Sequence, residues 1–359
     1  MAAAGITTVK LQSLPFVASG KVRELYKIDD SSLLMVVTDR ISAYDEILSN
    51  GVPDKGHILC QMSSHWFDVL RERVPELKHH VISMSPPAAP GVVTAEERAL
   101  LRGRCMQIRS LKVFPIEAIV RGYITGSAWS EYSKSGTVHG ISVPKGLELC
   151  QEFPDGPMYT PSTKAPAGEK DENISPEQAR KIVGDKYADQ IEALALKVYK
   201  TAHAYALERG IVIADTKMEF GRSTEFHGRL GSSLLPANCR KPMHVIVRGY
   251  LDPPPPATYA NRPGHDLGLD EKTDEIILVD EVLTPDCSRF WPAPVQVGKD
   301  QPSYDKQYIR DYLTANGLKG KAGVVLPDNV VAETTSKYRE VFHKLAGKTI
   351  DEARSGLEH

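Results

Sequence analysis

Two apolar, β-branched segments of strand length set the strongest limit on how this chain can fold: IVIADTKMEFG (211–221) and DEIILVDEVLTPD (274–286). Both become acidic toward their ends, a pattern that predicts two buried strands ending in polar groups. Side chains alternate between the two faces of a strand, so Asp215, Lys217 and Glu219 should project from one face. The first segment therefore carries a row of charges beside a buried core.

A second group of charges follows at the end of the later strand. If the two strands pair as a hairpin, Asp280 and Glu281 come close to the charged face of the first strand. Carboxylates with a lysine at strand ends are the groups that Mg²⁺ and its phosphate ligands require. A solvated polar face with a cross-strand ion pair would show the same spacing. The spacing alone leaves both interpretations open.

Further strands are predicted before this pair. SGKVRELYKID (19–29) has the alternation of a hairpin strand, and SSLLMVVTDR (31–40) is an apolar run typical of a buried strand. CMQIRSLKVFPIEAIVRGY (105–123) predicts two strands joined near Pro115.

Helical periodicity is clearest from residue 175 to residue 210. Ser175 is the expected N-cap with Pro176 at the first helical position, and Gly210 follows the last periodic residue. Two terminal helices are predicted in SYDKQYIRDYL (303–313) and VAETTSKYREVFHKLAG (331–347). The core is expected to include Met35, Trp66, Phe67 and Leu70.

A glycine-rich stretch, VRGYITGSAW, offers a second candidate site. Arg121 can supply a bidentate fork and Ser127 a hydroxyl donor, while Gly122 and Gly126 would let the backbone approach an anion closely. This chemistry suits a phosphate group. A glycine-rich turn with a surface arginine is the more common origin of such a pattern, so the motif alone does not decide.

Two weaker signals lie elsewhere. Gly20 and Lys21 precede a predicted strand, but a single glycine and lysine do not match the Walker pattern. The Pro/Gly-rich stretch TPSTKAPAGEKDENIS combines Lys164, Lys170 and Asp171. Such a stretch is more often a plain loop than a binding loop.

Composition excludes several classes of function. The chain has 359 residues, 41% of them hydrophobic, which is enough for one large domain or two lobes. A formal net charge of -2 gives no basic excess for binding nucleic acid or a membrane surface. The five cysteines form no CxxC pair, which indicates reduced thiols rather than disulfides or a metal–thiolate site. No secretion signal or membrane-spanning run is visible, and His79 and His80 are assigned to a polar turn without function. We therefore expect a soluble, cytoplasmic protein.

The interval 222–268 separates the two opening segments and is rich in Pro, Gly, Arg and Asn, without a sustained period. Unstructured intervals of this length in a compact domain are functional or disordered. The pentapeptide IVRGY occurs here (246–250) and also at 119–123. Only the earlier copy continues into ITGS; the later one continues into LDPPPP, which cannot extend a strand or helix. We interpret the repeat as coincidental.

Long stretches of this sequence resemble the SAICAR synthetase family, in its monomeric fungal form. They occur in the family's order and cover nearly the whole chain outside 222–268, and several are unlike anything in other families. The matching stretches are SGKVRELY, TDRISAYDEIL, PIEAIVRGYITGSAWSEY, MYTPSTKAPAGEKDENIS, ADTKMEFG, ILVDEVLTPDCSRFWP and SYDKQYIRDYL.

The resemblance implies an α+β fold of two lobes with ATP between them: an antiparallel β-rich lobe over 1–114 and an α/β lobe over 115–359. It also implies an ATP-dependent carbon–nitrogen ligase of purine biosynthesis. ATP would phosphorylate the carboxylate of carboxyaminoimidazole ribotide, and the amine of L-aspartate would displace phosphate. Such a reaction needs in-line positioning and charge neutralisation more than a covalent nucleophile. A monomer that binds neither nucleic acid nor membrane is expected.

The resemblance also implies roles for residues near the nucleotide. Lys21 would contact the ATP phosphates, and Glu117 would lie at the adenine end. Glu219 and Asp280 would bind Mg²⁺. Lys217 would neutralise phosphoryl charge between the nucleotide and its acceptor.

On the same basis, a second set of residues would hold the other substrates. Arg121, Ser127 and Arg289 would bind the phosphate and carboxylate of the ribotide. Asp215 would approach the ribotide or the aspartate amine, and with Lys217 and Arg289 it completes the expected catalytic set. The same cleft would be lined by Ser42, Asp45, Lys164 and Asp171.

The interval 222–268 departs from the family pattern, because EFG normally leads by a short turn into the next strand. It is either a surface loop at a hairpin tip, where long insertions are tolerated, or a translated intron. Its composition favours the second origin and predicts poor order. Two alternative functions follow: a related ligase or phosphotransferase with another carboxylate acceptor, and a non-catalytic nucleotide-binding protein inactivated by the insert.

Overall fold

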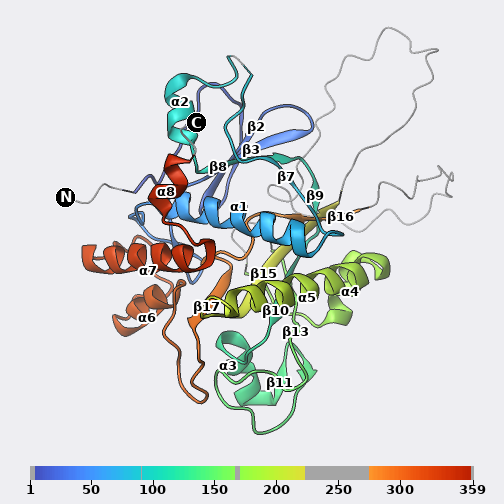
Figure 1. Ribbon diagram of the computed structural model, residues 1–359. Helices are drawn as coiled ribbons and strands as arrows, with labels where there is room; N and C mark the ends of the chain where they lie inside the picture. Colours follow the sequence, from blue (N-terminus) through green and yellow to red (C-terminus); the bar gives the residue numbers. More distant parts are fainter. Residues whose placement is uncertain (1–4, 90, 166–169, 223–274, 357–359) are drawn as a thin grey trace, which may run out of the picture.

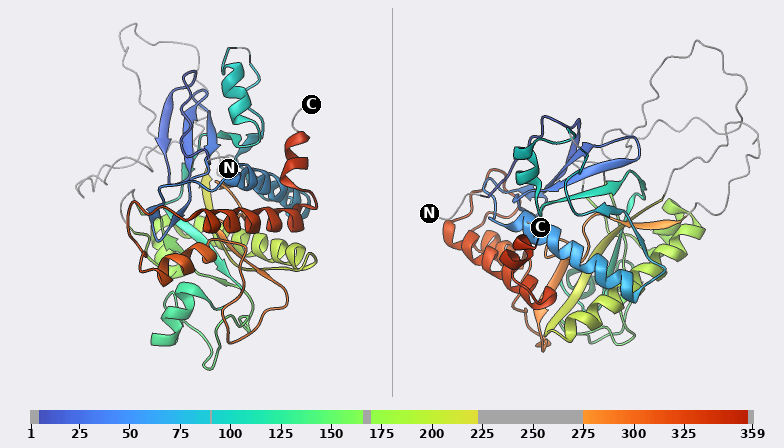
Figure 2. Two further views of the ribbon diagram at one scale, coloured as in Figure 1. Left: turned by 90° about the vertical axis from the view of Figure 1, so that its left-hand side faces the viewer. Right: turned by 45° about the horizontal axis from the view of Figure 1, so that its top comes forward.

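The computed structural model describes residues 5–89, 91–165, 170–222 and 275–356. In these residues two β-sheets stand on either side of a central helix, α1 (Lys55–Arg73), and further helices pack around the second sheet (Figures 1 and 2). This arrangement confirms the expected α+β, two-lobed fold. None of the described helices is long and apolar enough to cross a membrane.

The first sheet comes from the amino-terminal part of the chain, in the order β1-β2-β3-β8-β7. Its neighbouring strands are all antiparallel. Every residue of β3 is buried, because one face packs against α1 and the other against the amino-terminal segment and α2 (Ala95–Leu101). The strands are β1 (Phe16–Ser19), β2 (Arg23–Lys27), β3 (Ser32–Val37), β7 (Val81–Ser83) and β8 (Cys105–Arg109). The strands predicted within 19–29 and 31–40 are confirmed.

The second sheet is organised around one long strand, β15 (Ile211–Arg222). The first half of β15 pairs with β10 and β17, and its second half pairs with β16 and β9. The partners are β10 (Ile116–Arg121), β17 (Ser288–Pro292), β16 (Ile276–Val279) and β9 (Lys112–Val113). The sheet is extended by β13 (Met158–Tyr159) and β14 (Ser162–Thr163) on β10, and by β6 (Lys78–His79), which runs parallel to β16.

Two short hairpins complete the described strands. One consists of β4 (Ser42–Ala43) and β5 (Glu46–Ile47), and the other of β11 (Thr137–Val138) and β12 (Ile141–Ser142). The first hairpin matters for the site, because its turn lies beside the loop that enters β2.

Helix α1 joins the two sheets through a shared core. Its Trp66 and Phe67 belong to the same buried cluster as side chains from β3, β15 and α5 (Asp185–Leu207), so Trp66, Phe67, Met35 and Leu70 are buried as predicted. Figure 1 shows α1 between the first sheet and α5. The remaining helices are α3 (Gly126–Ser135), α4 (Pro176–Val183), α6 (Gln307–Ala315), α7 (Asp328–Ala346) and α8 (Ile350–Ser355).

Three local predictions need correction. Residues 105–123 form three strands, β8, β9 and β10, instead of two. The helical region begins at the predicted Ser175 cap, which accepts from the Gln178 amide, but it breaks at Gly184 into α4 and α5. The break follows from the backbone of Gly184, whose φ of 88° is incompatible with a continuous helix.

The third correction concerns His79 and His80, which do not lie in a polar turn. His79 is part of β6, and His80 is 2% exposed because its backbone continues the pairing with β16. Burial lowers the pKa of His80 to about 3, so its ring is neutral at physiological pH. Pairing with β16, which is distant in the sequence, thus places these two polar residues in the second sheet.

Two expectations about larger units stay open. The division at residue 114 remains a prediction, although β6 and β9 precede it and pair with the second sheet. Arg222, the first residue of the interval 222–268, still belongs to β15 and pairs with Ile276. The rest of that interval lies outside the described residues, so its predicted disorder is not tested.

Candidate active site

A cavity of about 310 Å³ opens where the first sheet, the β4–β5 hairpin and the second sheet meet. Its wall includes most of the residues predicted from the sequence: Lys21, Ser42, Asp45, Arg121, Asp171, Asp215, Lys217, Glu219, Asp280 and Arg289. The remaining predicted residues lie one contact behind this wall. Glu117 touches Lys217, Lys164 touches Glu219 and Ser127 touches Arg121.

Strand β15 carries the three charges that the alternation predicted, and all three reach the cavity. Asp215, Lys217 and Glu219 lie along one face of the strand, as expected. Thr216 also lines the cavity, with its hydroxyl 2.7 Å from that of Ser288 on β17. One strand therefore spans both ends of the site.

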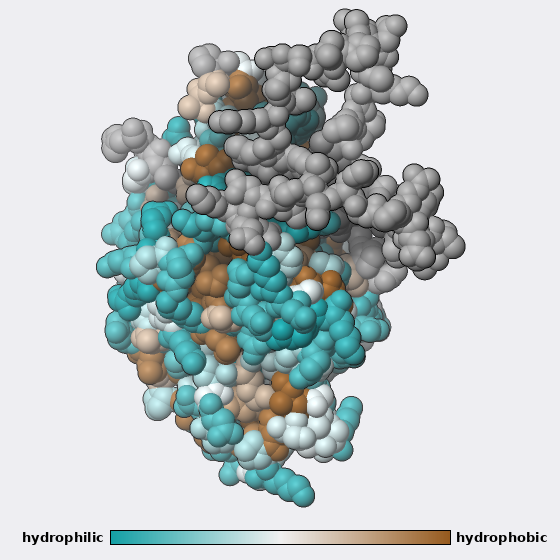
Figure 3. All heavy atoms as spheres, turned by 90° about the vertical axis from the view of Figure 1, so that its right-hand side faces the viewer, coloured by the Kyte–Doolittle hydropathy of each residue, from teal (hydrophilic) through white to brown (hydrophobic). Residues whose placement is uncertain are grey.

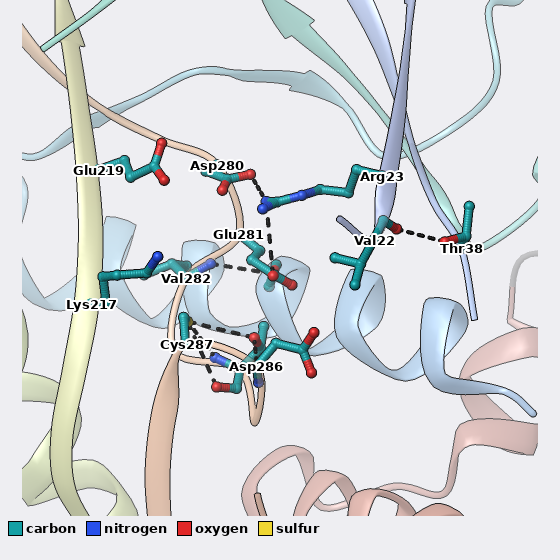
Figure 4. Close-up of polar contacts among 12 residues, drawn as sticks. Val22, Arg23, Thr38, Lys217, Glu219, Asp280, Glu281, Val282, Asp286 and Cys287 are labelled. Atoms are coloured by element: carbon teal, nitrogen blue, oxygen red, sulfur yellow. Dashed lines mark hydrogen bonds and ion pairs between the residues drawn. The ribbon is translucent and has the colours of Figure 1, made fainter. Parts of the chain in front are cut away.

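One end of the cavity is acidic. The antiparallel register places Glu219 opposite Val279, so Asp280 follows directly at the end of β16. Figure 4 shows Arg23 reaching from β2 to Asp280 and Glu281, with Glu219 and Lys217 on the other side. The Arg23 guanidinium lies 3.8 Å from Glu281 and forms an ion pair with Asp280. This predicted hairpin pairing is confirmed.

Electrostatics keep Glu219 ionised. Burial would raise the pKa of Glu219, but Lys164 and Lys217 outweigh it and hold the pKa below its ordinary value. Burial likewise would lower the pKa of Lys217, but Glu117 and Glu219 outweigh it and raise the pKa. Lys217 donates to Glu117, whose other oxygen accepts from the Ser162 hydroxyl at 3.0 Å. Lys217 is therefore a permanent cation between two carboxylates.

The acidic end fits a divalent cation only if a ligand helps to hold it. Within the described ranges, no three His, Cys, Asp or Glu side chains are arranged to hold a metal ion. Glu219 and Asp280 supply two carboxylates, and Mg²⁺ is commonly held by one or two carboxylates together with substrate phosphates. The residues present match that donor set.

The opposite end of the cavity is basic. Arg121 donates to Asp215 at 2.7 Å, to Thr160 at 3.1 Å and to Ser127 at 3.3 Å. Arg289, opposite Asp215 in the β15–β17 pairing, donates to the same carboxylate. Asp215 thereby holds two guanidinium groups side by side, and the Arg121, Ser127 and Arg289 that were predicted together are found together.

The glycines of VRGYITGSAW lie against neighbouring side chains, while the expected close approach of their backbone to an anion stays a prediction. A Cβ atom at Gly126 would lie 2.5 Å from Nη2 of Arg289, and Gly126 has a φ of +57°. A Cβ atom at Gly122 would collide with the Tyr199 hydroxyl. In this structure the two glycines make room for side chains, and Gly126 lets Arg289 lie against the start of α3.

The β4–β5 turn forms the mouth of the site. Tyr44 and Asp45 both have positive φ values, 54° and 67°, and Asp45 accepts from Lys21 Nζ at 2.6 Å. The Tyr44 hydroxyl lies 3.0 Å from that of Thr314, on α6. The hairpin is therefore tied on one side to the loop before β2 and on the other to α6.

Sequence reasoning missed several residues of the wall. Arg23 is the first residue of β2 and follows Lys21 by two residues, so the alternation of the expected hairpin strand contained this signal. Lys306 and Arg310 are four residues apart in a predicted helix, which places them on one helical face. No local signal marks Asp286. These residues all line the cavity.

A second hollow, of about 220 Å³, lies at the far end of β15 and is lined by apolar side chains together with Lys112 and Arg222. It contains none of the predicted site residues, and we therefore place the chemistry in the first cavity. Figure 3 shows a face of the molecule on which hydrophilic side chains predominate and hydrophobic ones occur in small patches.

Comparisons with known proteins agree with this geometry. A family model described as SAICAR synthetase matches residues 16–240 and 265–325. Phosphoribosylaminoimidazole-succinocarboxamide synthase of Cyberlindnera jadinii is 45% identical over 348 residues, covering 96% of this chain and 98% of that protein. The corresponding protein of Saccharomyces cerevisiae is 43% identical over 350 residues, covering 95% and 98%.

Solved structures show the same relationship. SAICAR synthase from Saccharomyces cerevisiae complexed with SAICAR has a TM-score of 0.74 at 42% identity, covering 96% of this chain and 99% of that one. A SAICAR synthetase in complex with ADP has a TM-score of 0.58 at 21% identity and shares the fold. The residues between the two matched ranges, 241–264, fall within the unusual interval 222–268. The chain belongs to the SAICAR synthetase family.

Proposed function

We propose that this chain joins L-aspartate to the carboxylate of carboxyaminoimidazole ribotide at the expense of ATP, giving SAICAR, ADP and phosphate. The observation that carries the proposal is the layout of β15. Its Glu219 lies at an acidic end suited to a metal-bound nucleotide, and its Asp215 lies at a basic end suited to a phosphorylated ribotide. Lys217 lies between them, where phosphoryl transfer would occur.

The reaction divides into two steps. In the first, a carboxylate oxygen of the ribotide attacks the γ-phosphorus of ATP, which forms an acyl phosphate and releases ADP. Lys217 would neutralise charge on the transferred group, because its raised pKa keeps it protonated. Lys21, at the mouth, would contact the nucleotide phosphates. Glu117 would lie at the adenine end of the nucleotide, and its contact with Lys217 would hold that lysine in place.

In the second step, the amine of L-aspartate attacks the acyl carbon, the carbon–oxygen bond to phosphate breaks, and phosphate leaves with the proton lost by nitrogen. Arg121, Ser127 and Arg289 would hold the ribotide through its anionic groups. Asp215 accepts from both guanidinium groups, so we propose that it orients these two cations and also contacts the ribotide. Ser42, Asp45, Lys164 and Asp171 would shape the rest of the cleft.

Glu219 and Asp280 would hold Mg²⁺, which when bound lowers the charge on the nucleotide phosphates. Support comes from the position of Glu219 on β15 and of Asp280 directly after the paired strand β16, because both residues line one cavity. The same placement disfavours a non-catalytic nucleotide-binding protein. The retained pair of Arg121 and Arg289 disfavours a ligase with a non-phosphorylated acceptor. We further propose that the protein acts as a cytoplasmic monomer.

The test is a reconstitution with purified full-length chain. ATP, MgCl₂, carboxyaminoimidazole ribotide and L-aspartate should yield SAICAR and ADP in equal amounts, and omission of any one should stop SAICAR formation. Lys217→Met should lower kcat by at least about 10²-fold. Because this change leaves Glu117 buried without its partner, Lys217→Met with Glu117→Gln separates lost catalysis from lost stability. ATP binding without SAICAR formation in the wild type would favour the non-catalytic alternative.

A further inference from the structure

A buried histidine with no part in the proposed reaction lies near the basic end of the cavity. His139 is 3% exposed, and its Nδ1 lies 2.9 Å from the carbonyl oxygen of Pro161. A carbonyl oxygen can only accept, so Nδ1 carries the proton and donates. Pro161 lies between Thr160 and Ser162, and both of these neighbours bond to residues of the site.

The junction of β13 and β14 supports two parts of the site at once. Thr160 Oγ1 accepts from Arg121 Nε at 3.1 Å, and the Ser162 hydroxyl donates to Glu117 at 3.0 Å. Glu117 in turn accepts from Lys217. A shift of this junction would therefore move both Arg121 and Lys217.

Strand pairing is interrupted at this junction, because Pro161 has no N–H group to donate. The register is the same on both sides of the interruption, since β13 and β14 both pair with β10. The Pro161 carbonyl accepts from the Ile174 N–H at 3.1 Å and from His139. Two contacts from outside β10 therefore hold the junction, and His139 supplies the one that comes from a side chain.

The local backbone holds the His139 ring in this position. His139 and Gly140 are the central residues of the β11–β12 turn, and their φ values of 49° and 74° are those that a type I′ turn requires. Glu131, on α3, accepts from both of their N–H groups at 3.0 Å and from the Thr137 hydroxyl at 2.8 Å. The turn follows α3 at the end of the molecule opposite the first sheet (Figure 1). A positive φ is uncommon for a residue other than glycine, and Glu131 stabilises it here.

The His139 ring is neutral in this environment. Burial lowers its pKa and the charge of Arg121 lowers it further, while the Pro161 carbonyl and Glu131 oppose both effects. Among the described residues, the buried Nε2 atom has no hydrogen-bond partner. A protonated ring would place an N–H there without an acceptor, close to a second cation. His139 therefore acts as a neutral donor and adds no charge to the basic end.

We infer that His139 is a positioning residue of this active site. It fixes the junction of β13 and β14, which orients Arg121 toward the ribotide and Lys217 toward the transferred phosphoryl group. His139 is not part of the cavity wall, so it acts only through these residues. The inference rests on the proposed function, because both roles belong to the ligase reaction. Loss of the His139 donor should therefore affect ribotide binding and turnover together.

The experiment compares His139→Gly with His139→Asn in the full-length chain, assayed well below the Tm of each variant. Glycine and asparagine both tolerate a positive φ, but only asparagine keeps an N–H donor at the δ position of the side chain. His139→Gly should raise KM for the ribotide and lower kcat, each about twofold to tenfold, because one neutral hydrogen bond is lost. His139→Asn should stay within about twofold of wild type. His65→Ala is the control: His65 packs on Trp66 and Tyr205 outside the cavity, so this change should lower Tm without changing kcat or KM.

Two kinetic outcomes would overturn the inference. A lower Tm of His139→Gly with unchanged kcat and KM, as in the control, would make His139 purely structural. An equal loss of activity in both His139 variants would exclude the hydrogen bond as the cause.

Hydrogen exchange supplies a measurement that needs no reactant. The N–H groups of Thr160 and Ile174 donate to the carbonyls of Ile119 and Pro161, so both should exchange faster in His139→Gly than in His139→Asn. Equal exchange in the two variants would show that His139 does not fix the junction. If wild-type enzyme makes no SAICAR, the proposed function fails, but hydrogen exchange still decides whether His139 holds this segment.

Discussion

The two ends of the cavity hold their charges in opposite ways. At the acidic end, Asp280 and Glu219 are paired with Arg23 and Lys164, cations that come from other segments. At the basic end, one buried carboxylate, Asp215, accepts from both Arg121 and Arg289. Elsewhere in the cavity wall, a second buried carboxylate, Asp286, accepts from Lys55 and Lys306. A ligand at the acidic end must replace existing ion pairs, whereas a ligand at the basic end meets cations that are already oriented.

This difference has a consequence for binding. In the proposed function, Glu219 and Asp280 would exchange their ion pairs with Lys164 and Arg23 for Mg²⁺, which would supply positive charge to these carboxylates. An anion at the basic end needs no such exchange, because Asp215 already orients Arg121 and Arg289, and both of these residues line the cavity. We therefore expect a single charge change at the acidic end to lower turnover. A single charge change among the cations of the remaining wall should lower stability or raise KM.

The largest effect is expected for Asp280→Asn. The neutral amide is a weaker ligand for a divalent cation than the carboxylate, so kcat should fall about 10³-fold, and added MgCl₂ should restore little of it. Far-UV circular dichroism and Tm should stay close to wild type, because Asp280 is partly exposed and ends a strand. Asp155→Asn, an exposed change outside the cavity, is the control. Near-normal turnover of Asp280→Asn would remove Asp280 from the proposed metal site.

Elsewhere in the cavity wall, Asp286→Asn should act mainly on stability. It leaves two buried ammonium groups without their carboxylate, so the free energy of unfolding should fall by about 3–5 kcal/mol at pH 7. The pKa of Asp286 is depressed in the folded protein, so its contribution is present above the ordinary value of 3.8 and is lost only as pH falls toward the lower folded value. The difference in free energy of unfolding between variant and wild type should therefore be constant from pH 5 to 8 and become smaller below about pH 4.

Urea unfolding at a series of pH values measures this difference. If the difference in free energy of unfolding became smaller near pH 6 instead, another titrating group would dominate its pH dependence. Asp189→Asn provides a contrast, because its ion pair with Arg180 is exposed and should contribute little at any pH.

A smaller effect, on KM, is expected for Gly126→Ala. The new Cβ would lie 2.5 Å from Nη2 of Arg289 and would displace its guanidinium, so KM for the ribotide should rise about tenfold to about hundredfold. Gly136→Ala is the matched control: Gly136 ends the same helix with φ of +72° and has open space around it. Both variants should lose about 1–3 kcal/mol of stability through backbone strain, but only Gly126→Ala should change KM. Equal KM values would exclude the steric role of Gly126.

The acidic end was predictable because its information is local. Strand alternation places Asp215, Lys217 and Glu219 on one face whatever the rest of the chain does, and hairpin pairing brings Asp280 alongside. The core positions in α1 and the cap at Ser175 were predictable for the same reason, since each depends on residues within one or two turns.

The stretch VRGYITGSAW marked Arg121 and Ser127 locally, but the partners of the other cations in the wall depend on contacts between distant segments. Asp286 is surrounded by Lys55, Lys306 and Tyr338 only after four elements have packed together. Gly126 is required because the Arg289 guanidinium lies against it, and His80 is buried because its backbone pairs with β16. A single sequence shows which residue types are present, but their partners follow from tertiary packing.

The smallest effect is expected at the mouth, where Asp45 pairs with Lys21 and both side chains are more than half exposed. Water screens such pairs, so Asp45→Asn should change the free energy of unfolding by less than about 1 kcal/mol, measured by urea titration. If Lys21 contacts the ATP phosphates, the same change frees it, and KM for ATP should shift no more than about threefold. A larger rise in KM for L-aspartate or ribotide would show that Asp45 itself contacts substrate. That outcome would extend the substrate-contacting wall from the basic end to the β4–β5 turn, whose positive φ values at Tyr44 and Asp45 would then serve binding directly.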